Sequence, residues 1–285
     1  MVSISVVTPS YNQGRFIERT IDSVLDQNVL DLDFFIIDGG SNDKTLDILR
    51  RYKDRVRWVS EPDHGQAHAV NKGIAATKGE IIAWINSDDI YFPGTLAKVQ
   101  QYFTENPSVD VLYGDAFHID LNDNIIEPYN TEPWSFERLK NICFLCQPAV
   151  FFRRRVVERS GLLDESLHFC MDYEYWLRLA MGGAVFTYLL DPLAGSRMYA
   201  GNKTLSQRVP VHAEINDMLK KKLGKVPARW LFNYANVFVN ERYKLYGIGR
   251  LAFIFMQSLL ASFRWNHGIS RDFFILIANW FRIQK

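Results

Sequence analysis

An alternation of short apolar runs with amphipathic segments over the first hundred residues constrains the fold more than any other feature. The runs are rich in β-branched side chains, which is typical of buried strands. They cover residues 4–8, 34–38, 56–59 and 81–85. Between them, apolar residues recur at helical spacing, as Ile17, Ile21 and Val24 do. This order predicts an α/β fold with a Rossmann-like, mostly parallel sheet flanked by helices.

A polar loop follows each expected strand. The four loops read TPSYNQG, DGGSND, EPDHGQ and NSDD. In open parallel sheets, ligands bind outside the carboxyl ends of the strands, because the loops diverge there and helix N-termini present free N–H groups. We therefore expect most of the functional residues in these loops.

The pattern changes twice along the chain. Residues 1–105 form the regular strand and helix half, and residues 106–206 form a mixed half with one clear helix at 173–181. Residues 207–285 are expected to form a helical tail, with Pro227 after a cluster of three lysines. The composition, 48% hydrophobic and 23% charged, is that of a globular protein.

The cysteines and the start of the chain indicate the compartment. Cys143 and Cys146 form a lone CxxC, and Cys170 is the only further thiol, so a zinc site is not favoured over buried, reduced thiols. The chain opens directly into a strand-like run, without the basic region and long apolar stretch of a secretory signal. We expect the catalytic body in the cytoplasm.

Asp88 and Asp89 directly follow an apolar strand. Carboxylates on such a turn suit a hard divalent cation that also binds substrate phosphates. For an isolated pair of aspartates, a cap on the helix beginning near Pro93 is the favoured alternative. For Asp38, too, a role in ligand binding and a structural role are both possible interpretations, because DGGSND is also typical of a tight turn and helix cap.

His64, His68 and Lys72 lie four residues apart and are expected on one helix face. A zinc pair is one interpretation, but the segment lacks the glutamate of a zinc protease helix. A cationic edge that faces phosphate suits these residues better. Asp172, at the start of a later helix, is equally compatible with a cap and with catalysis, and Glu174 is expected to face solvent.

Four segments resemble, in order and spacing, the inverting glycosyltransferases of family 2, which have the GT-A fold, and in particular those of bacterial surface-polysaccharide assembly. They span about residues 3–204. The segments are SVVTPSYNQGRFIERTIDSVLDQ, FFIIDGGSNDKTLDIL, EPDHGQAHAVNKGIAATKGEIIAWINSDDIYFPGTL, and QPAVFFRR followed by DESLHFCMDYEYWLRLA.

The resemblance implies a nucleotide-sugar-binding half at 1–105, an acceptor-binding half at 106–206 and a cofactor, Mn²⁺ or Mg²⁺, with Asp88 as its direct ligand. By the same match, Pro9 and Tyr11 line the uracil site and Asp38 bonds the base edge. The residues assigned to donor binding are Pro9, Tyr11, Asp38, His64, Gln66, Lys72, Asn86 and Ser87.

Asp172 matches the family's general base, which deprotonates the acceptor hydroxyl and typically contributes about 10² to 10⁴ in rate. The sequence departs from the family pattern at three positions. Asn86 replaces an aspartate of the metal motif, Met171 replaces a glutamate beside the base, and Tyr199 stands where relatives often have histidine. Trp134 is a candidate platform for sugar stacking, with a core position as the alternative.

The implied activity is inverting transfer of a hexosyl or N-acetylhexosaminyl group from a UDP-sugar or related donor. The acceptor is a hydroxyl of a glycan or lipid-linked molecule in polysaccharide or lipopolysaccharide assembly, and no nucleic-acid partner is expected. The alternative is a non-catalytic nucleotide-sugar-binding or membrane scaffold protein of the same fold. A nucleotidyltransferase is disfavoured because TPSYNQG carries no cation.

The tail contains two apolar stretches, 251–263 and 273–281, each shorter than the roughly 20 residues that span a bilayer. From Lys225 onward, nine Lys or Arg face only Glu241 and Asp272, and removing that excess of seven from the net charge of +1 leaves −6 for residues 1–224. These features suit helices lying in an anionic membrane interface at the inner face of the plasma membrane. Packing on the body or on a second subunit is the alternative.

Overall fold

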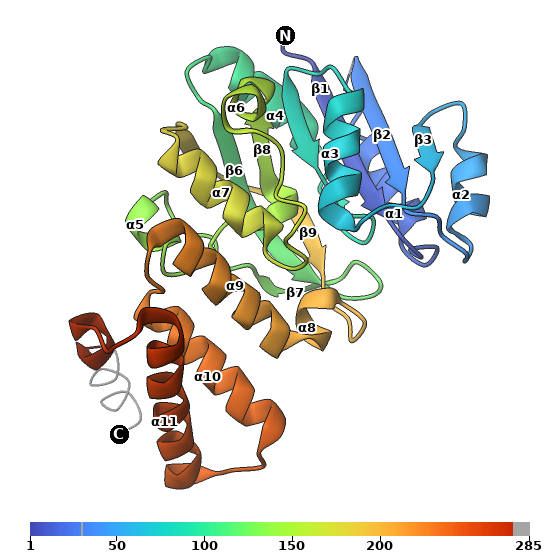
Figure 1. Cartoon of the computed structure of the whole chain (residues 1–285). Coiled ribbons are helices and arrows are strands. Elements are labelled where there is room, and N and C mark those ends of the chain that lie inside the picture. The colour runs from blue at the N-terminus through green and yellow to red at the C-terminus, as the bar shows by residue number, and fades with distance from the viewer. Residues whose placement is uncertain (30, 276–285) are drawn as a thin grey trace. The chain divides into compact units, whose positions relative to one another are not determined.

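The computed structural model describes residues 1–29 and 31–275 of the chain (Figure 1). Within this part, nine strands form one sheet in the order β3-β2-β1-β4-β8-β6-β9-β5, and β7 pairs with β6. The strands are β1 (Ile4–Ser10), β2 (Leu32–Asp38), β3 (Arg57–Ser60), β4 (Ile81–Trp84), β5 (Ile90–Tyr91), β6 (Val111–Ile119), β7 (Ile125–Pro128), β8 (Val150–Arg153) and β9 (Phe186–Arg197).

The first four strands are parallel, with β1 between β2 and β4 and with β3 at the outer side of β2. Their ends differ from the four predicted runs by no more than two residues. The helices that connect them are α1 (Ile17–Leu25), α2 (Thr45–Arg51) and α3 (Gln66–Ala76). The predicted α/β fold, with a largely parallel sheet flanked by helices, is confirmed.

The strand register brings the polar loops to one edge of the sheet. Ser10 lies beside Asp38, and Asp38 lies beside Ser60 on the next strand. The Ile85 amide, just after β4, donates to the Val7 carbonyl at 3.1 Å. We refer to the four loops at this edge as the carboxyl edge: residues 11–16, 39–44, 61–65 and 86–89.

A glycine sets the position of α3 on the sheet. A Cβ atom at Gly73 would lie 2.3 Å from Val7 Cγ1 and 2.6 Å from Ile37 Cδ1, so only glycine allows the helix this close to β1 and β2. The helix begins after Gly65, whose φ of +114° is unfavourable for other residues. Close packing and this turn place Gln66, the first residue of α3, at the carboxyl edge.

The second part of the sheet continues from β4. Strand β8 is antiparallel to both β4 and β6, and β9 is parallel to β6. The helices of this part are α4 (Thr95–Glu105), α6 (Arg154–Ser160) and α7 (Met171–Met181), with the short turn η1 (Gln147–Ala149) before β8. Trp176 of α7 is fully buried and its ring lies 6.0 Å from that of Phe152, which holds α7 against the sheet.

The chain divides into two compact units. The first comprises Met1–Trp134 with Phe144–Tyr199 and contains the sheet; the second comprises Ser135–Cys143 and the chain from Ala200 onward. The helices of the second unit are α5 (Phe136–Leu139), α8 (Lys203–Ser206), α9 (Arg208–Leu223), α10 (Ala228–Arg242) and α11 (Gly247–Asn266).

In the second unit α10 packs against both α9 and α11. A small apolar core forms between α10 and α11 from Ala235, Val239 and Ile254. The predicted apolar stretch 251–263 lies within α11, whereas residues 276–281 of the second stretch lie outside the described residues. No helix among the described residues is both long enough and apolar enough to cross a membrane.

Candidate functional site

The turn after β4 is held by the side chain of Asn86. Its Oδ1 accepts hydrogen bonds from Gln66 Nε2 at 2.7 Å and from Trp84 Nε1 at 3.1 Å, and its Nδ2 donates to Asp89 Oδ2 at 3.3 Å. Both lone pairs of the amide oxygen are therefore used. Asn86 ties the start of α3 to the turn, and two of the predicted donor-binding residues, Gln66 and Asn86, are in direct contact.

Asp88 is the half-buried carboxylate of the turn. The Tyr199 hydroxyl donates to Asp88 Oδ2 at 3.0 Å, and the Asp88 carbonyl accepts Arg197 Nε at 2.7 Å. Burial raises the pKa of Asp88, and the hydrogen bond from Tyr199 offsets part of this rise. Tyr199, which the resemblance aligns with a histidine of the family, thus contacts the candidate metal ligand Asp88 through its hydroxyl.

Asp89 is buried and serves the structure of the turn. Its Oδ1 accepts the backbone N–H of Arg197 at 2.9 Å, and its carbonyl accepts the Thr20 hydroxyl at 2.7 Å. Burial and the adjacent Asp88 carboxylate raise the pKa of Asp89 well above its usual value. Helix α4 is preceded by Gly94 and has no side-chain cap, so the alternative that Asp88 or Asp89 caps this helix is wrong. Ser87, between Asn86 and Asp88, is also buried.

Arg197, at the end of β9, is the residue that sequence reasoning missed. Its guanidinium is fully buried, donates to the carbonyls of Asp88 and Asp120 at 2.7 and 2.5 Å, and forms an ion pair with Asp123. It also lies over the Phe16 ring, 4.9 Å from its centroid. One side chain thus joins the β4 turn, the β6 to β7 turn and the first loop. An arginine ending an otherwise ordinary strand gives no sequence signal for this role.

Asp38 is fully buried at the end of β2. Its carboxylate accepts the amides of Gly40 and Ser41 at 3.1 and 2.9 Å and the hydroxyls of Ser41 and Ser60. Three of these donors bond to Oδ2 and one, the Ser41 hydroxyl, bonds to Oδ1. The predicted contact of Asp38 with the edge of a nucleobase stays a prediction.

Pro9 and Tyr11 flank the end of β1. Pro9 is buried in the strand in register with Ile37, whereas Tyr11, just beyond the strand, is 60% exposed. Nearby, the Asp43 carboxylate accepts the amides of Gly14 and Thr45, each at 2.9 Å, and so joins the first two loops. Tyr11 is therefore the exposed ring at this part of the carboxyl edge, while Asp43 fixes the loops around it.

The prediction that His64, His68 and Lys72 share one helix face, as a cationic edge, is wrong for His64, which precedes α3, while His68 and Lys72 lie within the helix. The His64 amide donates to His68 Nδ1 at 3.2 Å and the two rings lie 4.9 Å apart, while Lys72 forms an ion pair with Glu61. Within residues 1–29 and 31–275, no three His, Cys, Asp or Glu side chains come together as a group that could hold a metal ion. A phosphate at this edge would compete with Glu61 for Lys72.

The donor atoms at the turn nevertheless fit one kind of metal site. Mg²⁺ and Mn²⁺ are commonly held by one or two carboxylates together with substrate phosphates. Asp88 supplies one such carboxylate, but the amide oxygen of Asn86 already accepts two hydrogen bonds. The residues present therefore fit a cation that is held by Asp88 and mainly by the phosphates of a bound ligand.

Two acids share the first turn of α7 but differ in their surroundings. Asp172 is half-buried and its Oδ1 accepts the Tyr173 amide at 2.7 Å. Glu174 is fully buried and binds Arg178 through both oxygens, at 2.9 and 3.0 Å. The expectation that Glu174 faces solvent is wrong, because Arg178 one turn later pairs with it inside the protein.

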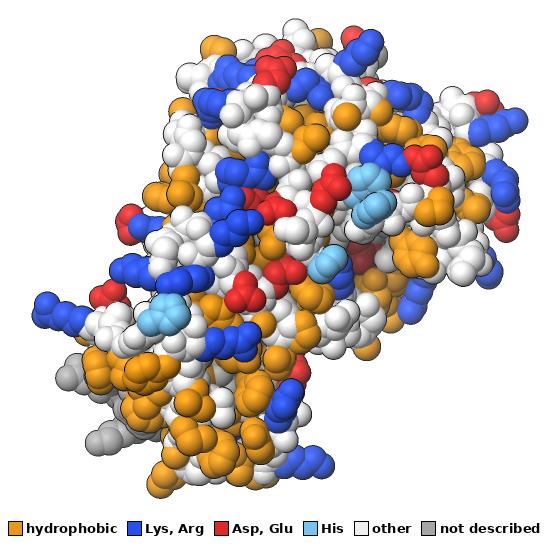
Figure 2. Space-filling model, viewed as in Figure 1, with side chains coloured by type: hydrophobic (Ala, Val, Ile, Leu, Met, Phe, Trp, Pro, Cys, Tyr) orange, Lys and Arg blue, Asp and Glu red, His pale blue; other side chains and the backbone are white. Residues whose placement is uncertain are grey.

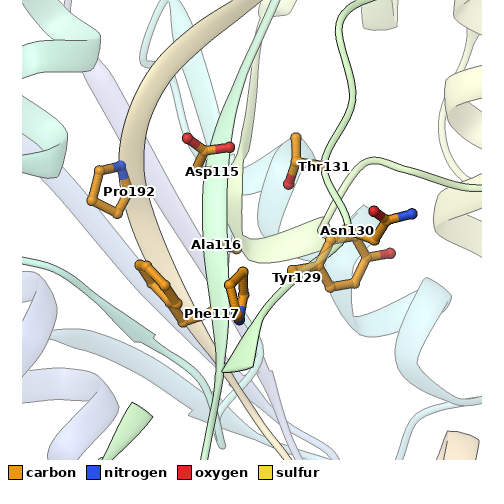
Figure 3. Close-up of a pocket in the computed structure, with 8 residues that line it drawn as sticks. Asp115, Ala116, Phe117, Tyr129, Asn130, Thr131 and Pro192 are labelled. Atoms are coloured by element: carbon orange, nitrogen blue, oxygen red, sulfur yellow. The ribbon is translucent and has the colours of Figure 1, made fainter. Parts of the chain in front are cut away.

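A cavity of about 430 Å³ opens between β6, the segment after β7, and β9 (Figure 3). Its lining combines the rings of Phe117 and Tyr129 with the polar side chains of Asp115, Asn130 and Thr131. The Thr131 hydroxyl is buried without a hydrogen-bond partner among the described residues. Rings beside a carboxylate, an amide and a hydroxyl suit a ligand with apolar faces and several hydroxyls.

Trp134, the candidate stacking platform, lies against other aromatic side chains. Its indole stacks on Phe186 with the ring centroids 3.8 Å apart and an interplanar angle of 2°. Tyr113 and Phe144 contact it edge-on or at a tilt, at 6.5 and 6.2 Å. Phe186 therefore occupies one face of the indole, which leaves that face unavailable to a sugar.

Known proteins similar to this chain share its fold and much of its sequence pattern. An uncharacterized glycosyltransferase of Methanocaldococcus jannaschii is 27% identical over 185 residues, which are 61% of this chain and 63% of that protein. Chondroitin synthase of Escherichia coli is 28% identical over 215 residues, 74% of this chain and 31% of that protein. The matches thus span between about a third and two thirds of these relatives.

Two solved structures show the same fold at low sequence identity. S. aureus TarS in complex with UDP-GlcNAc has a TM-score of 0.64 at 15% identity, over 91% of this chain and 81% of that one. The mannosyltransferase PcManGT of Pyrobaculum calidifontis, in complex with GDP-Man and Mn²⁺, has a TM-score of 0.62 at 17% identity, over 99% and 80%. The predicted GT-A fold is confirmed.

The family profile described as Glycosyl transferase family 2 matches residues 5–161, from β1 to the end of α6. The matched region includes the complete carboxyl edge and the NSDD turn. The chain belongs to glycosyl transferase family 2.

Proposed function

We propose that the chain transfers a sugar from a nucleotide-sugar donor, a UDP-sugar, to a hydroxyl of a glycan or lipid-linked acceptor, with inversion at the anomeric carbon. The observation that carries this proposal is the NSDD turn, in which Tyr199 and Arg197 contact Asp88 directly, while Gln66 and Asn86 bond to each other and hold the rest of the turn. The bound nucleotide sugars of the two solved structures support such a donor.

The donor would lie along the carboxyl edge. The exposed ring of Tyr11 is placed to cover the uracil base, and the loop organised by Asp38 would receive the base edge. Asp88 would hold a Mn²⁺ or Mg²⁺ ion bound to the diphosphate, and that ion would neutralise phosphate charge. Lys72 would exchange Glu61 for the diphosphate. His64, which contacts His68, is assigned to the same phosphate-binding edge.

Asp172 would act as the general base. The acceptor hydroxyl gives its proton to the Asp172 carboxylate while its oxygen forms a bond to the anomeric carbon. The bond between that carbon and the phosphate oxygen breaks in the same step, and its electron pair leaves with the nucleoside diphosphate. A single displacement of this kind inverts the configuration. The backbone bond from Tyr173 holds one carboxylate oxygen in place.

The acceptor would approach from the side of β6 and β9. The cavity there offers the rings of Phe117 and Tyr129 for the faces of a sugar, and Asp115, Asn130 and Thr131 for its hydroxyls. We assign residues 1–105 to donor binding, 106–206 to acceptor binding, and 207–285 to the helical tail. The similarity to chondroitin synthase supports a role in polysaccharide assembly. The proposal extends to lipopolysaccharide assembly and to a location at the inner face of the plasma membrane.

Calorimetry with UDP and Mn²⁺ tests the donor site. We expect metal-dependent binding of UDP that Asp88→Ala abolishes, because the carboxylate of the turn that would hold the ion is lost. The matched control is Asp89→Asn, which alters the neighbouring acid that bonds to Arg197 and should retain binding. Loss of binding in a folded Asp89→Asn, with retention in Asp88→Ala, would contradict the assignment.

A donor-hydrolysis assay with a panel of UDP-, GDP- and dTDP-sugars tests turnover. We expect UDP-sugar hydrolysis that Asp172→Asn lowers by about 10² to 10⁴, with UDP affinity unchanged. Normal turnover in Asp172→Asn would disprove the base assignment. Tight UDP binding without turnover of any sugar in the panel would favour the non-catalytic binding protein, for which the replacements at Asn86, Met171 and Tyr199 are the motivation.

A further inference from the structure

Helix α11 is apolar on two opposite faces. The inner face is buried and consists of Ile254, Ser258, Ala261 and Trp265. These residues follow one another at intervals of four, three and four, so they form one stripe along the helix. Ile254 packs with Ala235 and Val239 of α10. The inner face thus accounts for the attachment of α11 to the second unit.

The outer face carries a second apolar stripe. Phe253, Met256, Leu260 and Phe263 are 36, 43, 55 and 54% exposed, at intervals of three, four and three residues. At 3.6 residues per turn, these positions lie on the side of the helix roughly opposite the inner face. Figure 2 shows hydrophobic side chains gathered over the helices of this unit. Contiguous apolar surface of this kind marks an interaction site.

The charge around the outer face is of one sign. The chain has no Asp or Glu between Glu241 and Asp272, a stretch that includes the whole of α11. Lys244, Arg264 and Arg271 are exposed within this stretch. Over residues 200–275, twelve Lys or Arg face four Asp or Glu, a net charge of +8. An apolar stripe with cations near its two ends is complementary to an interface that has an apolar interior and an anionic outer layer.

We propose that the outer face of α11 (Phe253, Met256, Leu260 and Phe263) docks on an anionic lipid surface, with the helix lying in the plane of the interface. The apolar side chains enter the boundary between headgroups and acyl chains, while Lys244, Arg264 and Arg271 contact lipid phosphates. A second copy of the chain fits less well, because pairing through this face would bring together two copies of residues 200–275, each with a net charge of +8.

Co-sedimentation with vesicles tests the proposal on the full chain. The vesicles are neutral phosphatidylcholine alone, or the same lipid with 30% phosphatidylglycerol. We expect binding to the anionic vesicles, weakened at high salt because the cations are exposed, and much weaker binding to neutral ones. Equal binding to both, or no binding to anionic vesicles, would overturn the proposal without any variant.

The triple variant Met256→Gln, Leu260→Gln, Phe263→Gln should reduce partitioning by about tenfold or more, because three exposed apolar groups no longer enter the interface. Glutamine preserves helix propensity. The matched control is Leu190→Gln with Ile126→Gln, two exposed apolar residues of the first unit, at 81 and 54%. This control should bind vesicles within twofold of the parent chain.

Sedimentation velocity without lipid tests the alternative that a second copy of the chain binds the outer face of α11. A dimer that the triple variant dissociates, together with no vesicle binding, would show a second copy on this face and overturn the lipid proposal. UDP binding is measured on the same samples. It is expected to be unchanged in the triple variant, so failure of the lipid proposal and failure of the proposed transferase activity are distinguishable.

Discussion

The carboxyl edge of the sheet and the outer face of α11 both offer surface to a partner, but they are constructed in opposite ways. At the edge, Asp88 and Asp89 are held by residues more than a hundred positions away in the chain, namely Tyr199 and Arg197. On α11, the four exposed residues of the outer face lie within eleven residues of one helix. The first is a network of specific contacts, and the second is a pattern of local spacing.

This difference has consequences for mutation. A network of hydrogen bonds that positions one carboxylate is sensitive to each of its members, because buried polar groups left without partners are costly. An exposed apolar stripe contributes through summed area, so its members act in parallel and contribute little to the stability of the folded chain. Substitutions at the two regions should therefore differ in size and in what they affect.

The largest effect on stability is expected for Arg197→Met. The substitution removes a buried cation, leaves the Asp88 carbonyl without its donor and takes one of two donors from the Asp120 carbonyl, which should lower the free energy of unfolding by about 4 kcal/mol. The control is Arg19→Met, which loses a contact to the same Asp123 but from a side chain that is 34% exposed. There we expect under about 1 kcal/mol. Urea denaturation of both variants measures the difference, and equal losses would show that the buried network is not special.

The next effect tests the two faces of α11. Ile254→Ala should destabilise the second unit by about 3 kcal/mol, because it opens a cavity in the small core with Ala235 and Val239. Leu260→Ala, on the outer face and 55% exposed, should change stability by less than about 0.5 kcal/mol. Hydrogen exchange of the α10 and α11 amides reports on this unit directly. A large loss of protection in Leu260→Ala would mean that the outer face is covered by the protein itself.

A smaller effect separates the two acids of α7. Glu174→Gln keeps the shape of a fully buried side chain but removes the charge that pairs with Arg178, so we expect a loss of about 2 kcal/mol in stability. Turnover per folded molecule should stay within about threefold of the parent chain, in contrast to Asp172→Asn. Thermal unfolding and donor hydrolysis give the two readings. A stable Glu174→Gln variant with no turnover would contradict the assignment, because Glu174 rather than Asp172 would then be the acid required for turnover.

The smallest effect concerns the turn itself. Asn86→Asp adds a carboxylate beside Asp88 but removes the N–H that bonds to Asp89, so stability should fall by about 1 kcal/mol. Because a second acid can share a bound cation, Mn²⁺ affinity in the presence of UDP should rise severalfold. Calorimetric titration with Mn²⁺ measures this change. An unchanged or lower affinity would show that Asn86 serves only the hydrogen bonds to Gln66 and Trp84.

Much of the fold was predictable because its signals are local. The four parallel strands were located within two residues, since runs of β-branched residues between amphipathic helices have few other solutions. The helix at 173–181 was predicted two residues late, because Asp172 also suits the cap position before a helix, whereas the structure has Cys170 at that position and Asp172 in the first turn. The loops at the strand ends were identified correctly as the place where polar side chains gather.

The candidate site was predictable as a set of positions, but not as a set of contacts. The family resemblance named Asp88 rather than Asp89 as the metal ligand, and only the structure gives the physical difference between them, since Asp89 is bonded to the backbone of Arg197. Glu174 was expected at the surface because glutamate usually lies there. Its burial depends on Arg178, which also donates to the carbonyl of Leu162.

The sequence by itself determined the positions of the four parallel strands, the edge where the loops meet, the resemblance to the family, and the apolar stretch of α11. These follow from periodicity and from motifs whose members are close together in the chain. Only the tertiary structure decided that Asn86 holds α3, that Tyr199 contacts Asp88, and that Arg197 joins three loops. A side chain's role at a site depends on partners brought from up to 111 residues away, and no local pattern encodes such a pairing.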